Sequence, residues 1–481
     1  MIEKRIAKLL SIEYEKRLLI FDTSGFRAVF DYTGLLISRG FEVVLYEDIE
    51  VFRFRYEQEI RNSNLKYAVI VLDDLFVPYD VRKQFFEVEV SIKNIFPKLN
   101  EDVLKLYMKD IDLISYAYEQ LYTDCDTIEL TEKFISEIVF SKENIKNYCE
   151  LMAKNLLHSV TQSCIIANDW INVACKKALI DYYAARVNIR FDTGFVDNEF
   201  EKFIFNGYQK LSGETKKDAP AILPKVIDFI AHNKTAIIVI DGMSLFDFEI
   251  VSRHFEGIDY EYFCTYALIP TTTAISRQSL LSGKYPCEIK NPFQLAHEEK
   301  LFIQAAQNAG YSKQQILYTK GFDPPVSNFT KFIAVIINDI DDMMHGQKQG
   351  RVGMYNDVTL WAKSGKLQAL IRNLYNQGFN IYITSDHGNT PCIGTGGIRK
   401  SGVEVETKSK RMFILKDFAE EKEYFEGKVM NYPGYYLDKD YRYYICKSGI
   451  SFDNKNEEVI THGGISIDEV IVPFIKVKVV V

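Results

Sequence analysis

The chain has 481 residues, of which 47% are hydrophobic, and its formal net charge is -8 at pH 7. That length supplies roughly two to four domains with real hydrophobic cores, while the acidic balance argues against a general nucleic-acid-coating or anionic-membrane surface. The eight cysteines are scattered with no C-x-x-C pair, which disfavours a disulfide framework or a structural zinc and fits a reducing compartment.

The first residues, MIEKRIAKLLSIEYEKR, carry charges between their apolar positions and do not resemble a signal peptide. No run approaches the roughly 18 apolar residues that a membrane-spanning helix needs. We therefore expect a cytoplasmic protein without a membrane segment.

Short β-branched runs alternate with amphipathic stretches over residues 1–96, which predicts a small α/β domain. Acidic residues follow each of three runs: Asp22, Glu47 with Asp48, and Asp73 with Asp74. Carboxylates at strand ends could form a metal or phosphoryl-accepting site, but acidic residues are also good helix caps, and capping is the favoured interpretation. Apolar residues at helical spacing then predict a helical linker domain over 97–215.

A polar stretch at 213–220 marks a boundary, and a second α/β series fills 216–481. Its buried-strand candidates are 235–242, 332–339, 379–388, 411–415 and 470–481. A helix over 357–377 connects two of them, which is a βαβ crossover and predicts a largely parallel sheet. The last run alternates Lys476 and Lys478 with valines, which predicts an edge strand.

Potential metal ligands stand at the ends of these strands: Asp241; Asp339, Asp341, Asp342 and His345; Asp386 and His387; and, before the last strand, His462. Carboxyl ends of parallel strands meet at one edge of a sheet, so these groups should converge. Each Asp alone could be a simple cap. Together, Asp and His ligands without cysteine predict two ions of zinc, with manganese as the alternative, about 4 Å apart.

A possible nucleophile lies in 267–286, where an extended run stops at Pro270 and three threonines begin a helix. Backbone N–H groups without intrahelical partners stabilise an oxyanion at such a point. The alternative is that Thr271, Thr272 and Thr273 only cap the helix.

These motifs, in order, resemble the alkaline phosphatase superfamily. They are D-G-M at 241, P-x-x-T at 270 with the glycine of S-G ten residues after the threonine, D-x-x-x-H at 341, S-D-H-G at 385 and T-H-G-G at 461. Within that superfamily, residues 235–481 resemble a PglZ domain. The resemblance implies a mostly parallel sheet flanked by helices and two divalent metal ions.

The resemblance also implies roles for single residues. The first metal would be held by Asp341, His345 and His462, and the second by Asp241, Asp386 and His387 with the hydroxyl of Thr273. Asp339 or Asp342 could replace Asp341. The nucleophile would be Thr273, and Arg277, in a pair similar to the S-R pair of sulfatases, would contact the oxyanion unless it is a surface arginine.

What the resemblance implies about function is a metal-dependent phosphodiesterase acting on nucleotides or oligonucleotides through a phosphothreonine. It would serve bacterial anti-phage defence beside other BREX-type proteins. The alternatives are a non-catalytic scaffold with a structural metal site, and a phosphomonoesterase or mutase. The oligomeric state is left open.

Two further stretches are open to two interpretations each. The loop after His387 contains Arg399, Lys400, Lys408, Lys410 and Arg411 and could be a lid that grips phosphates, or a solvated surface loop. The tyrosines of 432–444 could stack nucleic-acid bases, although strand pairing and core packing explain them more simply. Tyr435 and Tyr436 are the residues to test.

Overall fold

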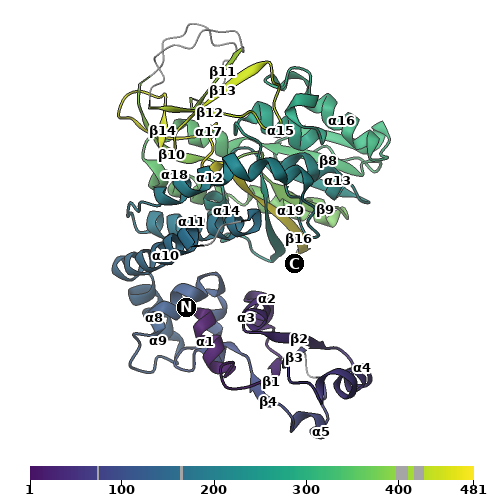
Figure 1. Ribbon diagram of the computed structural model, residues 1–481, viewed down its shortest axis with the longest axis vertical. Helices are drawn as coiled ribbons and strands as arrows, with labels where there is room; N and C mark the ends of the chain where they lie inside the picture. Colours follow the sequence, from purple (N-terminus) through teal and green to yellow (C-terminus); the bar gives the residue numbers. More distant parts are fainter. Residues whose placement is uncertain (73–74, 163–165, 397–409, 417–426, 481) are drawn as a thin grey trace. The chain divides into compact units, whose positions relative to one another are not determined.

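The computed structural model describes the chain except for residues 73–74, 163–165, 397–409, 417–426 and 481. It divides into two compact units, Met1–Tyr148 and Cys149–Val481 (Figure 1). The division falls within helix α10 (Lys142–Gln162), inside the segment 97–215 that we interpreted as one helical domain. The three-domain scheme with boundaries at 96 and 215 stays an interpretation of the sequence.

The first unit contains the predicted small α/β arrangement. Its sheet has the order β2-β3-β1-β4, with every pair parallel. The strands are β1 (Arg17–Asp22), β2 (Phe41–Tyr46), β3 (Lys66–Leu72) and β4 (Phe86–Glu89). The helices are α1 (Ile2–Leu9), α2 (Phe26–Val29), α3 (Thr33–Ser38), α4 (Ile49–Arg55), α5 (Tyr79–Arg82), α6 (Ile92–Ile95), α7 (Glu101–Lys105), α8 (Ile111–Tyr118) and α9 (Ile128–Phe134).

Acidic residues at the ends of these strands act as caps. The carboxylate of Asp22 accepts hydrogen bonds from the backbone N–H groups of Phe26 (2.7 Å) and Arg27 (2.8 Å) and from the hydroxyl of Tyr32. Asp48 caps α4 in the same way. Asp73 and Asp74 lie outside the described residues. The capping interpretation therefore accounts for Asp22 and Asp48.

The second unit is built on a six-stranded sheet of order β6-β16-β9-β5-β8-β7. The strands are β5 (Thr235–Ile240), β6 (Ile258–Tyr266), β7 (Ile316–Lys320), β8 (Phe332–Ile337), β9 (Asn380–Thr384) and β16 (Ile471–Val480). Neighbours from β9 to β7 run parallel, and β16 runs antiparallel to both β6 and β9. The expected mostly parallel α/β sheet is confirmed.

The last strand is not an edge strand, contrary to our prediction. β16 lies between β6 and β9, and residues 471–475 are fully buried. The two lysines that suggested an edge lie beyond that buried part, where Lys476 and Lys478 both pair with Glu261 of β6. Charge alternation here reflects a solvated strand end with a cross-strand partner rather than an unpaired strand.

Helices cover both faces of this sheet, which explains why every residue of β5 and β8 is buried (Figure 1). The α-helices that follow α10 in this unit are α11 (Ala167–Arg186), α12 (Gly194–Asn206), α13 (Val226–Ile230), α14 (Leu245–Ser252), α15 (Thr273–Ser282), α16 (Glu298–Asn308), α17 (Asp339–Gly346), α18 (Gly350–Lys363), α19 (Lys366–Asn376) and α20 (Ile467–Val470). One core joins α13, α15 and α16 to Ile237 and Val239 of β5. In the part of the chain that the structure describes, no helix is long and apolar enough to cross a membrane.

The single helix predicted over 357–377 is two helices, α18 and α19. They are separated at Gly365, whose φ of +71° is a left-handed conformation that glycine adopts without strain. The predicted apolar stripe on α19 is confirmed, since its members are buried: Leu367, Leu370, Ile371 and Leu374.

Two three-stranded sheets complete the unit, with the orders β11-β13-β12 and β14-β10-β15. Their strands are β10 (Thr390–Gly394), β11 (Met412–Lys416), β12 (Val429–Tyr432), β13 (Tyr441–Cys446), β14 (Ile450–Ser451) and β15 (Glu458–Thr461). The predicted strand at 411–415 is thus present, but it belongs to a separate antiparallel sheet.

Candidate active site

Three neighbouring strands deliver the acidic ligands to one end of the large sheet. Asp241 directly follows β5, and Asp386 follows β9 with one residue between them. Asp341 lies in the first turn of α17, which comes after β8. Because β8, β5 and β9 are adjacent and parallel, their carboxyl ends place these carboxylates together. All three side chains are buried.

The first group of potential ligands consists of Asp241, Asp386 and His387, whose ligand atoms all lie within 4.8 Å of one another. Nε2 of His387 is 3.6 Å from Oδ1 of Asp241 and 3.8 Å from Oδ2 of Asp386. This is the set that the resemblance assigned to the second metal.

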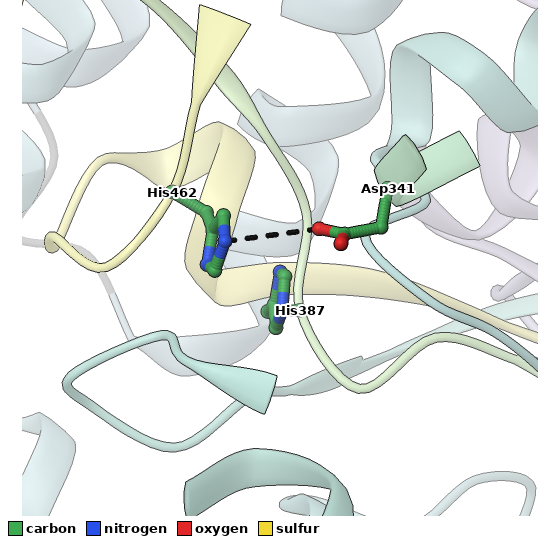
Figure 2. Close-up of side chains that lie close together, drawn as sticks. All are labelled: Asp341, His387 and His462. Carbon is green, nitrogen blue, oxygen red and sulfur yellow. Dashed lines mark ion pairs between the residues drawn. The ribbon is translucent and has the colours of Figure 1, made fainter. Parts of the chain in front are cut away.

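The second group consists of Asp341, His387 and His462. Nε2 of His462 is 3.7 Å from Oδ1 of Asp341, and the rings of His387 and His462 stack with centroids 4.2 Å apart (Figure 2). His345 also reaches this carboxylate, at 3.4 Å, but its side chain is 32% exposed. The resemblance assigned Asp341, His345 and His462 to the first metal, whereas the group of close ligand atoms contains His387 instead of His345.

Among the aspartates of α17, Asp341 is the one that faces these groups. Asp339 accepts a hydrogen bond from Nε1 of Trp361 at 2.8 Å, and Asp342 is exposed. The helical turn points only one of the three carboxylates inward, which favours Asp341 over Asp339 and Asp342 as the candidate ligand.

Both buried imidazoles present the same nitrogen to the site. Nδ1 of His387 lies 3.0 Å from the carbonyl of Gly388, and Nδ1 of His462 lies 2.9 Å from the carbonyl of Thr271. A carbonyl only accepts, so Nδ1 carries the hydrogen and Nε2 keeps a lone pair. That is the tautomer a metal ligand needs.

The surroundings strongly shift the pKa values of three of these side chains. Burial and the neighbouring Asp386 raise the pKa of Asp241 well above its ordinary value. Burial also raises the pKa of Asp341, but the nearby histidines lower it more, to below its usual range. Burial and the adjacent His387 lower the pKa of His462 to about 3, so this imidazole is neutral at physiological pH.

This environment fits divalent cations. Oδ1 of Asp341 and Oδ2 of Asp386 are buried and accept no hydrogen bond from any residue that the structure describes. Unpaired buried carboxylate oxygens are costly in free energy unless a cation offsets them. Carboxylate and imidazole donors without thiolates suit zinc or manganese.

Of the three threonines, Thr273 is the one that lies against the ligands. It is the first residue of α15, and its Oγ1 is 3.2 Å from Nε2 of His387 and 3.5 Å from Oδ1 of Asp241. The hydroxyl of Thr271 instead binds the turn that carries His462, accepting from the N–H of Gly463 at 3.0 Å. The hydroxyl of Thr272 is buried, has no hydrogen-bond partner among the described residues and makes no cap.

Arg277, one turn further along α15, is buried and not a surface arginine. Its Nη1 is 2.5 Å from Oδ2 of Asp241, and its Nε is 2.7 Å from Oε2 of Glu298. These two carboxylates hold the guanidinium. Contact of Arg277 with a bound oxyanion stays a prediction.

Sequence reasoning missed the groups that hold the ligand loops. Asn389, next to the S-D-H-G motif, donates to the carbonyl of Gly242 at 2.9 Å and accepts from Nη1 of Arg351 at 2.8 Å. Nη2 of Arg351 also pairs with Asp468 at 2.9 Å. These contacts fix the segment that follows Asp386 and His387. The only local signal was a polar residue directly after the motif.

Arg411 is the second missed group, and its position contradicts a role as a phosphate-gripping lid residue. It is fully buried and pairs with Glu469, whose Oε1 also accepts from the N–H of Gly464 at 2.8 Å. The pair therefore holds the turn after His462. Lys410 is exposed and pairs with Asp453, while Arg399, Lys400 and Lys408 lie outside the described residues.

The motif glycines permit close packing within the protein. A Cβ on Gly388 would lie 1.9 Å from the carbonyl oxygen of Asp468, and one on Gly464 would lie 2.6 Å from Cζ of Arg411. Close contact with neighbouring protein groups is sufficient to require glycine at both positions.

The tyrosines singled out for base stacking make contacts within the protein. The hydroxyl of Tyr435 donates to the carbonyl of Phe205 at 2.8 Å, and that of Tyr436 donates to the carbonyl of Gln209 at 2.7 Å. The ring of Tyr436 packs against Tyr285, with centroids 4.8 Å apart. Both rings are half-buried, so these contacts favour the packing interpretation.

A parallel-rich sheet covered by helices, with Asp and His groups at the strand ends, defines an alkaline-phosphatase-like domain. Residues 224–477, more than half of the chain, match the family model described as the BREX system PglZ alkaline phosphatase-like domain. The chain belongs to the PglZ family, as its motifs had indicated. No curated protein sequence matches it.

Solved structures with a related fold include murine ectonucleotide pyrophosphatase/phosphodiesterase 5, with 14% identity, a TM-score of 0.35, and coverage of 50% of this chain and 87% of that chain. Another is phosphonoacetate hydrolase from Sinorhizobium meliloti 1021, with 12% identity, a TM-score of 0.33, and coverage of 51% and 90%.

Proposed function

We propose that this protein is a metal-dependent phosphodiesterase that uses Thr273 as its nucleophile and acts on nucleotides or oligonucleotides. One observation carries the proposal. The hydroxyl of Thr273 lies at the start of a helix and within 3.5 Å of two members of a buried Asp/His group that fits a divalent cation.

The reaction would follow from the positions of these groups. Oγ1 of Thr273 attacks phosphorus and loses its proton, the bond to the leaving alcohol breaks and that alcohol takes up a proton, and the phosphoryl group, still esterified to the retained alcohol, becomes bonded to Thr273. Water then attacks the same phosphorus and releases Thr273. Backbone N–H groups at the first turn of α15 stabilise charge on the phosphate oxygens.

Two divalent cations would be held by Asp241, Asp386 and His387 and by Asp341, His345 and His462. When bound, they would activate the attacking hydroxyl and water and stabilise the leaving oxygen. We expect zinc, with manganese as the alternative.

Engagement of Arg277 supports a diester substrate over a monoester. A phosphate monoester is doubly charged and benefits from a guanidinium on its terminal oxygens. Two donor atoms of Arg277 are already engaged by Asp241 and Glu298 before any substrate binds, which leaves less of the guanidinium to neutralise a second charge. A diester has one negative charge and one fewer terminal oxygen to satisfy.

The test is a hydrolysis panel on the purified full chain loaded with zinc or manganese. We expect turnover of bis-p-nitrophenyl phosphate to exceed that of p-nitrophenyl phosphate and p-nitrophenyl sulfate. Zero metal uptake and zero turnover would support the scaffold alternative, and preferred turnover of the monoester would support a monoesterase or mutase.

The family description connects this domain to BREX systems, and we propose that the protein works in the cytoplasm beside other BREX proteins in defence against phage. If it acts there as an enzyme, Thr273→Val should abolish restriction of phage plating while the protein remains at wild-type abundance. Full restriction by this variant would show that catalysis is not what defence requires.

A further inference from the structure

Arg277 contacts Asp241 through Nη1 and Glu298 through Nε. Neither the motifs nor the proposed reaction assigns a role to Glu298. Glu298 is the first residue of α16, and its side chain is buried. Its Oε2 accepts from Nε of Arg277 at 2.7 Å, and its Oε1 accepts from the hydroxyl of Tyr318 on β7. Tyr318, Glu298, Arg277 and Asp241 thus form one chain of contacts from the edge of the sheet to the site.

The geometry of Asp241 shows what this chain of contacts does. Arg277 binds Oδ2 of that carboxylate, whereas Oδ1 is the oxygen near Nε2 of His387 (3.6 Å) and Oγ1 of Thr273 (3.5 Å). The guanidinium therefore selects one rotation of the carboxylate and leaves Oδ1 directed at the ligand group. A planar guanidinium can do this only if it is itself fixed in orientation.

Glu298 supplies that fixation. The Nε and Nη1 atoms of Arg277 lie on different edges of the guanidinium, so binding Nε to Glu298 determines where Nη1 points. Tyr318 in turn holds the other oxygen of Glu298. Asn338 contributes a weaker contact, 3.4 Å from Nη1.

We propose that Glu298 is a positioning residue for metal binding: through Arg277 it orients Asp241 so that Oδ1 serves as a ligand. The inference rests on the proposed function, since it takes the group Asp241, Asp386 and His387 to bind a divalent cation. Glu298 also adds a negative charge near that group. Its removal therefore weakens cation binding through both geometry and charge.

The decisive variant is Glu298→Gln, which keeps the size of the side chain but removes the charge and one of the two accepting oxygens, so it cannot hold both Arg277 and Tyr318 as Glu298 does. Glu299→Gln is the matched control, because Glu299 is the next residue of the same helix and is exposed. Tyr318→Phe is a milder variant that removes only the hydroxyl holding Glu298. Each is prepared as the full chain, freed of metal, and titrated with zinc against a chromophoric chelator.

We expect Glu298→Gln to weaken one of the two bound zinc equivalents by about 10- to 100-fold, the usual effect of losing a residue that orients a ligand. Glu299→Gln should bind both equivalents as the wild type does, and Tyr318→Phe should lose affinity to a smaller extent. Excess metal should restore kcat of Glu298→Gln with KM unchanged. A residue that only joined α16 to α15 would lower the unfolding midpoint of the metal-free protein without changing zinc affinity.

Wild-type zinc affinity in Glu298→Gln would overturn this inference while leaving the proposed function intact. If that variant does not fold, Tyr318→Phe decides the question, and unchanged affinity there overturns the inference. A wild-type chain that takes up no metal would overturn the proposed function, and this inference with it.

Discussion

Oγ1 of Thr273 lies 3.2 Å from Nε2 of His387, although the two residues are 114 positions apart in the sequence. The contact joins the start of α15 to the loop after β9. Because Nδ1 of His387 is directed at a carbonyl, Nε2 faces the hydroxyl and the carboxylates. A helix start and two strand ends thus meet at one point, where an attacking hydroxyl and its activating groups would have to lie.

The first prediction is that diester turnover depends on the hydroxyl of Thr273. Thr273→Val keeps the β-branched shape and removes only the oxygen, so we expect diester turnover to fall by at least about 1000-fold, as it does when a nucleophile is lost. Zinc content should stay at or above half of the wild-type value, because the Asp and His ligands remain. The measurements are kcat on bis-p-nitrophenyl phosphate and elemental analysis of the same sample.

Thr272 offers a matched control for that experiment. Its hydroxyl is buried and has no partner in the described part of the chain, so Thr272→Val removes an unsatisfied group and should preserve activity within a few-fold. Equal losses in the two variants would mean that the helix start, rather than the hydroxyl of Thr273, matters. Wild-type turnover by Thr273→Val would disprove the assignment of the nucleophile.

Gly388 is the subject of the second prediction. An added Cβ would lie 1.9 Å from the carbonyl of Asp468, a backbone group that cannot move aside easily. We expect Gly388→Ala to lower the free energy of unfolding by about 3 kcal/mol and to reduce metal affinity, because His387 is adjacent. Gly346→Ala is the control, since a Cβ there meets nothing within 4 Å. Equal unfolding midpoints for the two variants would contradict this prediction.

The strands and the convergence of potential ligands at their ends could be predicted from the sequence because both signals are local. β-branched runs such as the one before Asp241 predict buried strands, and parallel strands bring their carboxyl ends together whatever the order of the sheet. The family motifs then named Thr273 among three threonines. These predictions needed no knowledge of which strand neighbours which.

Features that depend on distant contacts could not be read in this way. Arg411 and Glu469 are 58 positions apart, and nothing near Arg411 distinguishes a buried pair from a lid residue. Glu298 resembles its exposed neighbour Glu299 until α16 is packed against α15. The internal position of β16 was likewise hidden, because two lysines that pair with Glu261 look the same in the sequence as two unpaired ones.

Acid sensitivity of the metal-free protein is the third prediction. The folded pKa of His462 is about 3, below the ordinary value of 6.5, so between these values the unfolded chain binds a proton that the folded chain does not. Stability from this residue is complete above pH 6.5 and falls by about 1.4 kcal/mol per pH unit as the pH decreases toward 3. Urea unfolding at several pH values in the presence of a chelator measures this slope.

Variants separate the effect of His462 on the pH dependence of stability from that of Asp241. The raised pKa of Asp241 acts in the opposite direction, because it removes stability as the pH rises. His462→Asn keeps a donor for the carbonyl of Thr271 and should show a shallower loss of stability below pH 6.5. His158→Asn, at an exposed position on α10, should keep the wild-type slope. An unchanged slope in His462→Asn would contradict the prediction.

The fourth prediction is that replacing Asp386 stabilises the metal-free protein and at the same time weakens metal binding. Its Oδ1 accepts from the N–H groups of Gly242 and His387, whereas Oδ2 is buried and has no hydrogen-bond partner within the residues the structure describes. Asp386→Asn keeps the accepting oxygen and replaces the unpaired one with an amide that no longer repels Asp241. We expect the metal-free variant to be about 1 to 3 kcal/mol more stable than the metal-free wild type, by urea unfolding in chelator. It should also bind one zinc ion fewer and lack diester turnover, because a ligand is lost.

Asp342→Asn, at an exposed position of α17, should change neither property. If metal-free Asp386→Asn were less stable than the metal-free wild type, the closeness of the Asp386 and Asp241 carboxylates would not destabilise the metal-free protein. That result would contradict the prediction.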